Sequence, residues 1–262
     1  MNILETIIGK KRIEVEQRKS SKKISTLEAM PLFKRKTLSL RAALLNADKT
    51  GIIAEFKRKS PSKGYINQHS SVREVIGDYV KFGASAVSVL TDEEFFGGSL
   101  SDFQQARNYD IPILRKDFII DEYQLIESKS FGADIILLIA ACLSKDEVRQ
   151  LAAFAKQLGL EVLLEIHHES ELEHICDDVD IVGINNRNLK TFKVDIAHSI
   201  ALSKKIPSNK IKISESGLHE ASTIHWLKSA GFSGFLMGEK FMKENNPGEA
   251  FAEFVKKLTN HQ

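Results

Sequence analysis

Strand-like apolar runs alternate with helix-like segments along this chain, and this repeated order limits the folds it can adopt. The alternation begins after about residue 49, and eight strands are expected at 51–57, 85–90, 112–116, 134–139, 161–166, 180–184, 210–214 and 233–237. Helical spacing of apolar residues occupies 72–82, 121–131, 144–158, 219–229 and 247–258. Eight strand–helix units over roughly 210 residues predict an α/β fold, a (β/α)8 TIM barrel, whose usual length is about 250 residues.

Two of the predicted helices begin with residues that commonly cap a helix. Ser144 precedes Glu147 as in a capping box, and Asp121 opens another helix. The main alternative fold, a doubly wound open sheet, usually carries a glycine-rich turn after its first strand, and the sequence has no Gly-x-Gly-x-x-Gly or Walker-type loop. The sequence therefore predicts a single barrel domain over 1–262.

The first 48 residues are interpreted as an N-terminal helical extension of the barrel. Its first apolar residues have the spacing of an amphipathic helix packed on the main body, and they are Ile3, Leu4, Ile7 and Ile8. The stretch 20–47 carries weaker signals, with a second short helix expected near 38–45.

Composition and charge count against several classes of protein. With 262 residues and 42% hydrophobic content, the chain can bury the core of one large domain. The longest apolar run, 135–143, has nine residues, whereas a bilayer span needs roughly 20, so no membrane partner is expected. Residues 1–36 hold ten Lys or Arg against four Asp or Glu, with Phe33 as the one aromatic, so nucleic-acid binding is not expected. Two distant cysteines and an early charged N-terminus predict a cytoplasmic protein.

The carboxyl ends of the predicted strands carry charged and polar residues. Glu55 and Lys57 share one face of the first strand, where buried ions are costly unless they are paired or meet a ligand. Later strand ends add Lys116, Glu165, Asn185, Arg187 and Glu215. Barrel active sites form at this end, so we expect these side chains to converge on one mouth. Taken singly, each also suits a surface ion pair, a helix cap or a polar turn.

Small residues follow the seventh and eighth predicted strands. Ser216-Gly217 and Gly238-Glu239 lie where barrels often bind phosphate through backbone N–H groups, although a plain helix-entry turn is the alternative. The histidines are not grouped with acidic residues in ligand spacing, so no metal site is predicted.

These segments resemble one family closely, the indole-3-glycerol-phosphate synthases of tryptophan biosynthesis. The similarity covers nearly all of residues 50–242 and rests on the ordered motifs AEFKRKSPSKG from Ala54, LTD from Leu90, FFGGS from Phe95, RKDFIID from Arg115, LEVLLEIH from Leu160, GINNRNL from Gly183, SESG from Ser214 and MGE from Met237. Departures are small: Arg115 stands where many relatives have Cys, and Asn188 where many have Asp.

The resemblance implies a small phosphorylated substrate, 1-(2-carboxyphenylamino)-1-deoxyribulose 5-phosphate, which closes to indole-3-glycerol phosphate with loss of carbon dioxide and water. It implies no cofactor and no metal. The implied catalytic residues are Lys116, Glu165, Lys57 and Glu55. The implied substrate contacts are Ser60, Phe118, Asn185, Arg187, Glu215, Ser216, Gly217, Gly238 and Glu239.

Lys116 is expected to be the general acid, with a pKa lowered by neighbouring cations. The division of the dehydration step among Glu165, Glu55 and Lys57 is left open. Glu239 is expected to point outward, since a carboxylate would repel phosphate. The loop 57–63 is expected to be mobile without ligand and to close over the mouth.

Two other functions compete with the synthase. One is a phosphoribosylanthranilate isomerase, whose relatives use a Cys and an Asp at strand ends, but neither Cys142 nor Cys176 lies at such a position. The other is a non-catalytic phosphosugar-binding barrel, which would keep Ser216, Gly217 and Gly238 without requiring Lys116 or Glu165.

Overall fold

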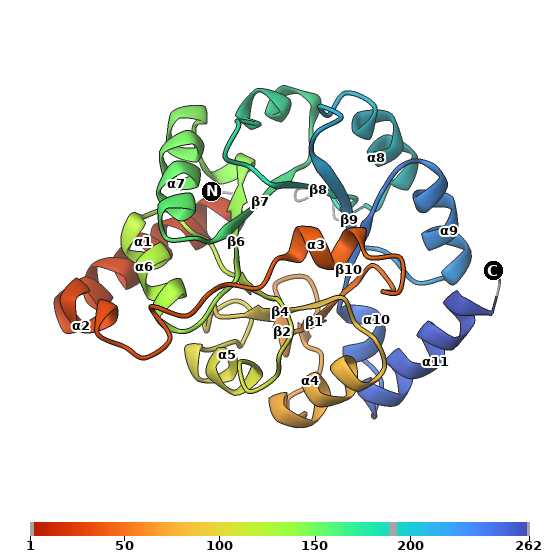
Figure 1. Ribbon diagram of the computed structural model, residues 1–262, viewed down its shortest axis with the longest axis horizontal. Coiled ribbons are helices and arrows are strands. Elements are labelled where there is room, and N and C mark those ends of the chain that lie inside the picture. Colours follow the sequence, from red (N-terminus) through yellow and green to blue (C-terminus); the bar gives the residue numbers. More distant parts are fainter. Residues whose placement is uncertain (1–2, 189–192, 261–262) are drawn as a thin grey trace.

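The computed structural model describes residues 3–188 and 193–260, so Leu189 of the GINNRNL motif lies outside it. Eight parallel strands form a closed barrel (Figure 1). In barrel order they are β1 Ile52–Phe56, β4 Ala86–Leu90, β5 Ile113–Lys116, β6 Ile135–Ile139, β7 Glu161–Ile166, β8 Ile181–Asn185, β9 Ile211–Glu215 and β10 Gly234–Met237. The predicted TIM barrel is confirmed.

Helices surround the barrel and connect its strands. They are α4 Val72–Lys81, α5 Leu100–Ala106, α6 Glu122–Ser130, α7 Lys145–Gln157, α8 Ile196–Ser203, α9 Ala221–Ser229 and α11 Pro247–Thr259, with shorter turns at η1 Ala140–Cys142, η2 Glu169–His174 and α10 Glu239–Met242. The predicted capping box is present, because Ser144 accepts from Glu147 N–H while the Glu147 side chain accepts from Ser144 N–H. No helix among the described residues is both long and apolar enough to cross a membrane.

Alternation along each strand divides the core into two layers. Ile53 and Leu163 belong to an apolar cluster inside the barrel, whereas Ala54 and Phe56 belong to the larger cluster between strands and helices. Glu55 has the parity of Ile53, so it points inward. Strand geometry thus directs the charged residues of the first strand toward the barrel axis.

The N-terminal extension contains α1 Ile3–Ser21, α2 Ile24–Glu28 and α3 Leu40–Leu45. In Figure 1, α3 lies across the centre of the barrel. Its Leu40 and Leu44 are buried with the inner cluster, so this helix closes the end of the barrel opposite the strand carboxyl ends. The segment before it is anchored to buried Asp134, which pairs with Arg35 and accepts from Leu38 N–H at 2.8 Å.

A buried ion network attaches α1 to the other end of the barrel. Lys11 is 1% exposed, and its Nζ lies 2.9 Å from carboxylate oxygens of both Asp92 and Asp117. Arg115 is fully buried and contacts Asp117 at 3.0 Å and Glu127 at 2.9 Å. The backbone on both sides of Lys116 is therefore held by paired charges.

Candidate active site

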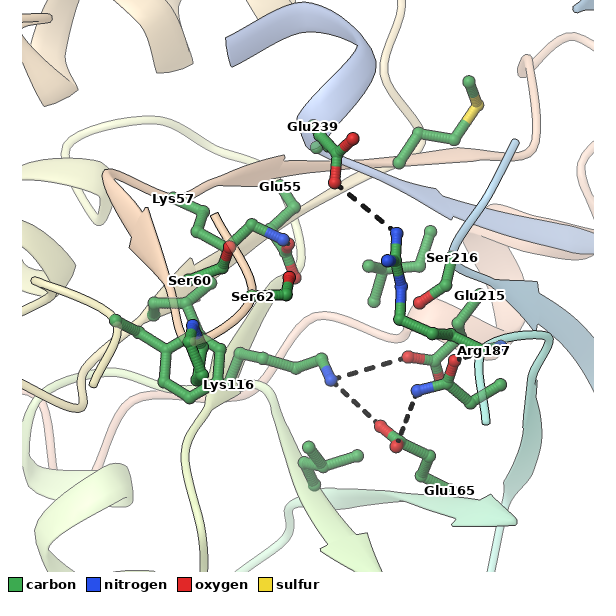
Figure 2. Close-up of a pocket in the computed structure, with 18 of the residues that line it drawn as sticks. Glu55, Lys57, Ser60, Ser62, Lys116, Glu165, Arg187, Glu215, Ser216 and Glu239 are labelled. Carbon is green, nitrogen blue, oxygen red and sulfur yellow. Dashed lines mark hydrogen bonds and ion pairs between the residues drawn. The ribbon is translucent and has the colours of Figure 1, made fainter. Parts of the chain in front are cut away.

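All the residues predicted as catalytic or substrate-binding line one pocket at the carboxyl ends of the strands. They come from β1 and its loop, β5, β7, β8, β9 and the turn after β10. Figure 2 shows several of these side chains pointing into the same space. The structure thus brings the predicted set together, while the role of each residue stays a prediction.

Lys116 lies at the centre of this charged group. Its Nζ is 3.0 Å from Glu165 Oε2 and 3.5 Å from Glu215 Oε2 (Figure 2). Asn185 Nδ2 donates to Glu165 Oε1 at 3.0 Å. The Glu165 carboxylate is therefore oriented by an ammonium on one oxygen and an amide on the other.

The expectation that cations lower the pKa of Lys116 was wrong. Burial acts to lower its pKa, but the carboxylates of Glu165, Glu215 and Glu55 outweigh burial and raise the pKa above its ordinary value. Burial acts in turn to raise the pKa of Glu165, yet Lys116 outweighs it and holds that pKa below the ordinary value. The two residues therefore form a charged pair at neutral pH.

Glu215 differs from Glu165 in its protonation. Burial, with Glu165 and Glu55 nearby, raises the pKa of Glu215 to about 7 although Lys116 opposes the shift. Glu215 Oε1 is buried and makes no hydrogen bond within the described chain. Gly183 leaves space for it, because a Cβ there would lie 2.1 Å from Glu215 Oε1. A carboxyl group in this state can donate a proton or a hydrogen bond at neutral pH.

Glu55 and Lys57 form a second pair across the pocket from this group (Figure 2). Glu55 is 4% exposed, and its Oε1 lies 3.0 Å from Lys57 Nζ. Gly238 packs directly against this pair, since a Cβ at Gly238 would lie 2.8 Å from Glu55 Cβ. The glycine is therefore required by Glu55 as well as by any ligand at the turn.

The rim of the pocket corrects the expectation for Glu239. Its side chain does not point outward: one oxygen lies 3.5 Å from Arg187 and the other 2.5 Å from Lys63 (Figure 2). The carboxylate thus holds two cations near the predicted phosphate turns. Repulsion from a phosphate is the reason we expected the outward direction, and attraction by Arg187 and Lys63 outweighs it when no ligand is bound.

The loop after β1 folds as a short antiparallel hairpin of β2 Lys59–Ser60 and β3 Gly64–Tyr65. Arg58 fixes its base by contacting both oxygens of Asp102, at 2.5 and 3.1 Å. Gly64 adopts a φ of 67°, which suits glycine at this tight turn. The Ser60 hydroxyl is buried at the pocket and has no hydrogen-bond partner in the described chain, so it is available to a ligand.

The turn after β9 holds an unusual backbone conformation. Ser216 has a φ of 68°, which is uncommon for a residue other than glycine, and Gly217 follows with 69°. Asn186 supports this turn by donating to the Ser216 carbonyl at 2.7 Å. Asn186 was not predicted as a site residue, although it lies within the quoted GINNRNL motif. Strain held in this way is typical of ligand-binding turns.

An apolar wall completes the pocket, and the sequence interpretation missed it. Its members include Phe96, Leu137, Ile139, Ile3, Leu4 and Ile7. Phe96 and Phe118 lie 6.0 Å apart between ring centroids. Phe96 is in a quoted motif, but β6 ends without a polar residue and gave no signal. Within residues 3–188 and 193–260, no cluster of His, Cys, Asp and Glu side chains could hold a metal ion.

Comparison with known proteins places this site in a family. The family model described as indole-3-glycerol phosphate synthase matches residues 4–254. Among similar proteins, an indole-3-glycerol phosphate synthase of Bacteroides thetaiotaomicron is 48% identical over 98% of this chain and 99% of its own length. One of Caldanaerobacter subterraneus is 43% identical over 98% of each chain.

Solved structures support the fold at lower identity. The 3-hexulose-6-phosphate synthase of Salmonella typhimurium superposes with a TM-score of 0.63 at 11% identity, over 81% of this chain and 100% of that one. A tryptophan synthase alpha-subunit of Pyrococcus furiosus gives 0.62 at 12% identity, over 81% and 99%. The family model and the curated relatives together show that the chain belongs to the indole-3-glycerol phosphate synthase family.

Proposed function

We propose that this enzyme closes the ring of 1-(2-carboxyphenylamino)-1-deoxyribulose 5-phosphate to indole-3-glycerol phosphate, as a carboxy-lyase of tryptophan biosynthesis, with Lys116 as general acid. Membership of the family supports the reaction. The observation that supports the role of Lys116 is its position in the pocket between Glu165 and Glu215. This contact keeps the ammonium charged and aimed at one place.

The pocket offers a separate partner for each part of this substrate. The phosphate suits the turns Ser216-Gly217 and Gly238-Glu239 beside Arg187, which supplies a positive charge. The aromatic ring suits the apolar wall that contains Phe96 and Phe118. The substrate carboxylate suits the charged Lys57.

Ring closure joins the aromatic carbon that bears the carboxylate to the ketone carbon. Lys116 gives its proton to the ketone oxygen as that bond forms, so the ketone becomes a hydroxyl group. Carbon dioxide then leaves, and the electron pair it leaves behind neutralises the cationic ring. No cofactor is needed because the ring itself accepts these electrons.

Dehydration needs one proton donor and one base. Lys57, held by Glu55, can give a proton to the departing hydroxyl as water leaves. Glu165 is ionised, so it is suited to remove the proton from the ring system. Glu215, with a pKa of about 7, is suited to donate a hydrogen bond to the same oxygen. This assignment answers a division of roles that the sequence left open.

Indole fluorescence on adding substrate tests the reaction directly. The synthase produces an indole, an isomerase does not, and a non-catalytic binder produces nothing. Loss of the signal in Lys116→Ala is the matched control for a contaminating activity. Absence of indole emission with the wild-type protein would contradict the proposal. The cytoplasmic location and the absence of nucleic-acid partners stay predictions.

A further inference from the structure

His167 contacts Glu165 but is not among the described residues that line the pocket. It follows β7 two positions after Glu165, and side chains two apart in a strand share a face. His167 is 5% exposed, and its Nε2 lies 3.3 Å from Glu165 Oε1. Neither the predicted catalytic set nor the proposed reaction uses this buried imidazole.

A second carboxylate lies on the other side of the ring. Glu171, from η2, has Oε2 3.7 Å from His167 Nδ1. The same oxygen accepts from the backbone N–H groups of His167 at 2.5 Å and His168 at 3.2 Å. The backbone therefore fixes Glu171, and the imidazole is held between two carboxylates.

Two anions at this distance favour the charged imidazolium against burial. Burial acts to lower the pKa of His167, but Glu165 and Glu171 outweigh it and raise the pKa to about 9. The titratable groups around His167 are Glu165 on its own strand, adjacent His168, Glu171 of η2, Glu215 of β9 and His198 of α8, whose ring nitrogen lies 3.1 Å from the His167 carbonyl.

We propose that His167 is a positioning residue for Glu165, whose carboxylate it keeps ionised and oriented toward the pocket. This inference rests on the proposed function, in which Lys116 gives up its proton. Before that transfer, Glu165 has two cationic neighbours, Lys116 on Oε2 and His167 on Oε1. After it, Lys116 is neutral, and His167 is the cation that still contacts Glu165 within the described chain. Glu165 then stays a base for dehydration and does not drift toward other donors.

The substitution His167→Gln removes this charge while keeping a polar side chain. The informative signal is the acidic limb of kcat against pH that Glu165→Gln abolishes. In His167→Gln we expect that limb to move upward by about 1 to 3 pH units, the usual effect of a lost opposite charge. Below the limb, kcat falls about tenfold per unit, while KM changes little because His167 does not line the pocket.

His168→Gln is the matched control, because it removes an exposed imidazole from the adjacent position. We expect it to leave the limb in place, and we expect His167→Lys, which restores a cation, to return the limb toward the wild-type position. An acidic limb of His167→Gln that coincides with the wild type would overturn the role. So would an equal shift in His168→Gln.

NMR titration of histidine-labelled wild-type enzyme tests the charge without any substitution. We expect the His167 imidazole to titrate near 9, and titration at or below the ordinary value of about 6.5 would overturn the inference. A wild type that makes no indole would overturn the proposed function and the role of His167 with it. A wild type that makes indole while the limb stays in place would overturn the role of His167 alone.

Discussion

Lys116 and Glu165 form a buried ion pair with 3.0 Å between Nζ and Oε2, although they are 49 positions apart in sequence. The pair lies in the pocket and makes each partner responsible for the charge of the other. Removing one side of such a pair leaves a buried uncompensated charge, so substitutions here act on protonation as well as on chemistry.

Lys116→Ala should lower kcat by about 10²- to 10⁴-fold, the usual contribution of a general acid. Lys116→Arg should also fail, because a guanidinium does not release its proton near neutral pH and has another shape. Steady-state kinetics with a circular dichroism check of folding measures this. Lys145→Ala, an exposed lysine, is the control. Retained kcat with a raised KM would reassign Lys116 to substrate binding.

Glu165→Gln should lower kcat to a comparable extent and remove the acidic limb of its pH profile. The amide keeps size and hydrogen bonding to Asn185 but cannot accept the proton. Measurement of kcat between pH 4 and 9 provides the test. An unchanged profile together with a lower melting temperature would show that Glu165 only holds Lys116 in place.

Glu215 should make stability depend on pH. Its pKa is raised from 4.5 to about 7, so its favourable contribution is fully present below 4.5 and is lost as pH rises through about 7. Glu215→Gln has no such loss. Its free energy of unfolding relative to the wild type should increase between pH 4.5 and 8, by at most about 3 kcal/mol. Denaturant titration at both pH values measures this, and a constant difference would show that Glu215 is ionised throughout.

The hairpin of residues 59–65 should open without ligand and close over bound substrate analogue. Lys63–Glu239 is an ion pair with a half-exposed lysine, and such pairs contribute at most about 1 kcal/mol. Trypsin should therefore cut at Lys59 or Lys63 in the free enzyme, faster in Glu239→Gln, and more slowly with the analogue. Equal cleavage with and without the analogue would argue against closure.

Arg187→Gln should raise KM sharply with little change in kcat at saturation, because phosphate binding is remote from the reacting carbon and acts mostly uniformly. Inhibition by inorganic phosphate should weaken in parallel. Crystals soaked in sulfate provide the direct test, with the anion expected beside Ser216-Gly217 and Gly238-Glu239. An anion elsewhere in the mouth, with these turns empty, would refute the assignment.

Gly238→Val is a less selective probe of phosphate binding than the sequence suggested. A side chain at Gly238 meets Glu55 at 2.8 Å, so it displaces the partner of Lys57. We therefore expect this variant to lower kcat as well as to raise KM. Unchanged kcat would show that the Glu55–Lys57 pair is not needed for the chemistry.

The strands and the positions of their polar ends could be predicted from the sequence because both follow from local rules. Strand alternation gives Glu55 and Lys57 one face, and repeated strand–helix units bring strand carboxyl ends to one rim. The capping residues Ser144 and Asp121 were likewise visible, because a helix N-terminus uses neighbours within a few positions.

The N-terminal extension shows where local rules stop. Its amphipathic helix was predicted, but the burial of Lys11 with Asp92 and Asp117 was not. Leu40 was expected only as part of a short helix, yet it is fully buried in the barrel interior. Deleting about 40 residues therefore removes core contacts, and we now expect it to lower the melting temperature as well as to raise KM.

The amino-acid sequence by itself determined the barrel and the residue types at its mouth, because period-two patterns and motif order are properties of the linear chain. Only the tertiary structure decided the protonation and direction of those residues. Lys116 meets carboxylates from β1, β7 and β9, so its pKa rises where cations had been expected to lower it. Glu239 turns toward Arg187, and His167 joins Glu165 to Glu171. Electrostatic interaction depends on distance in space, which the folded barrel sets between residues far apart in sequence.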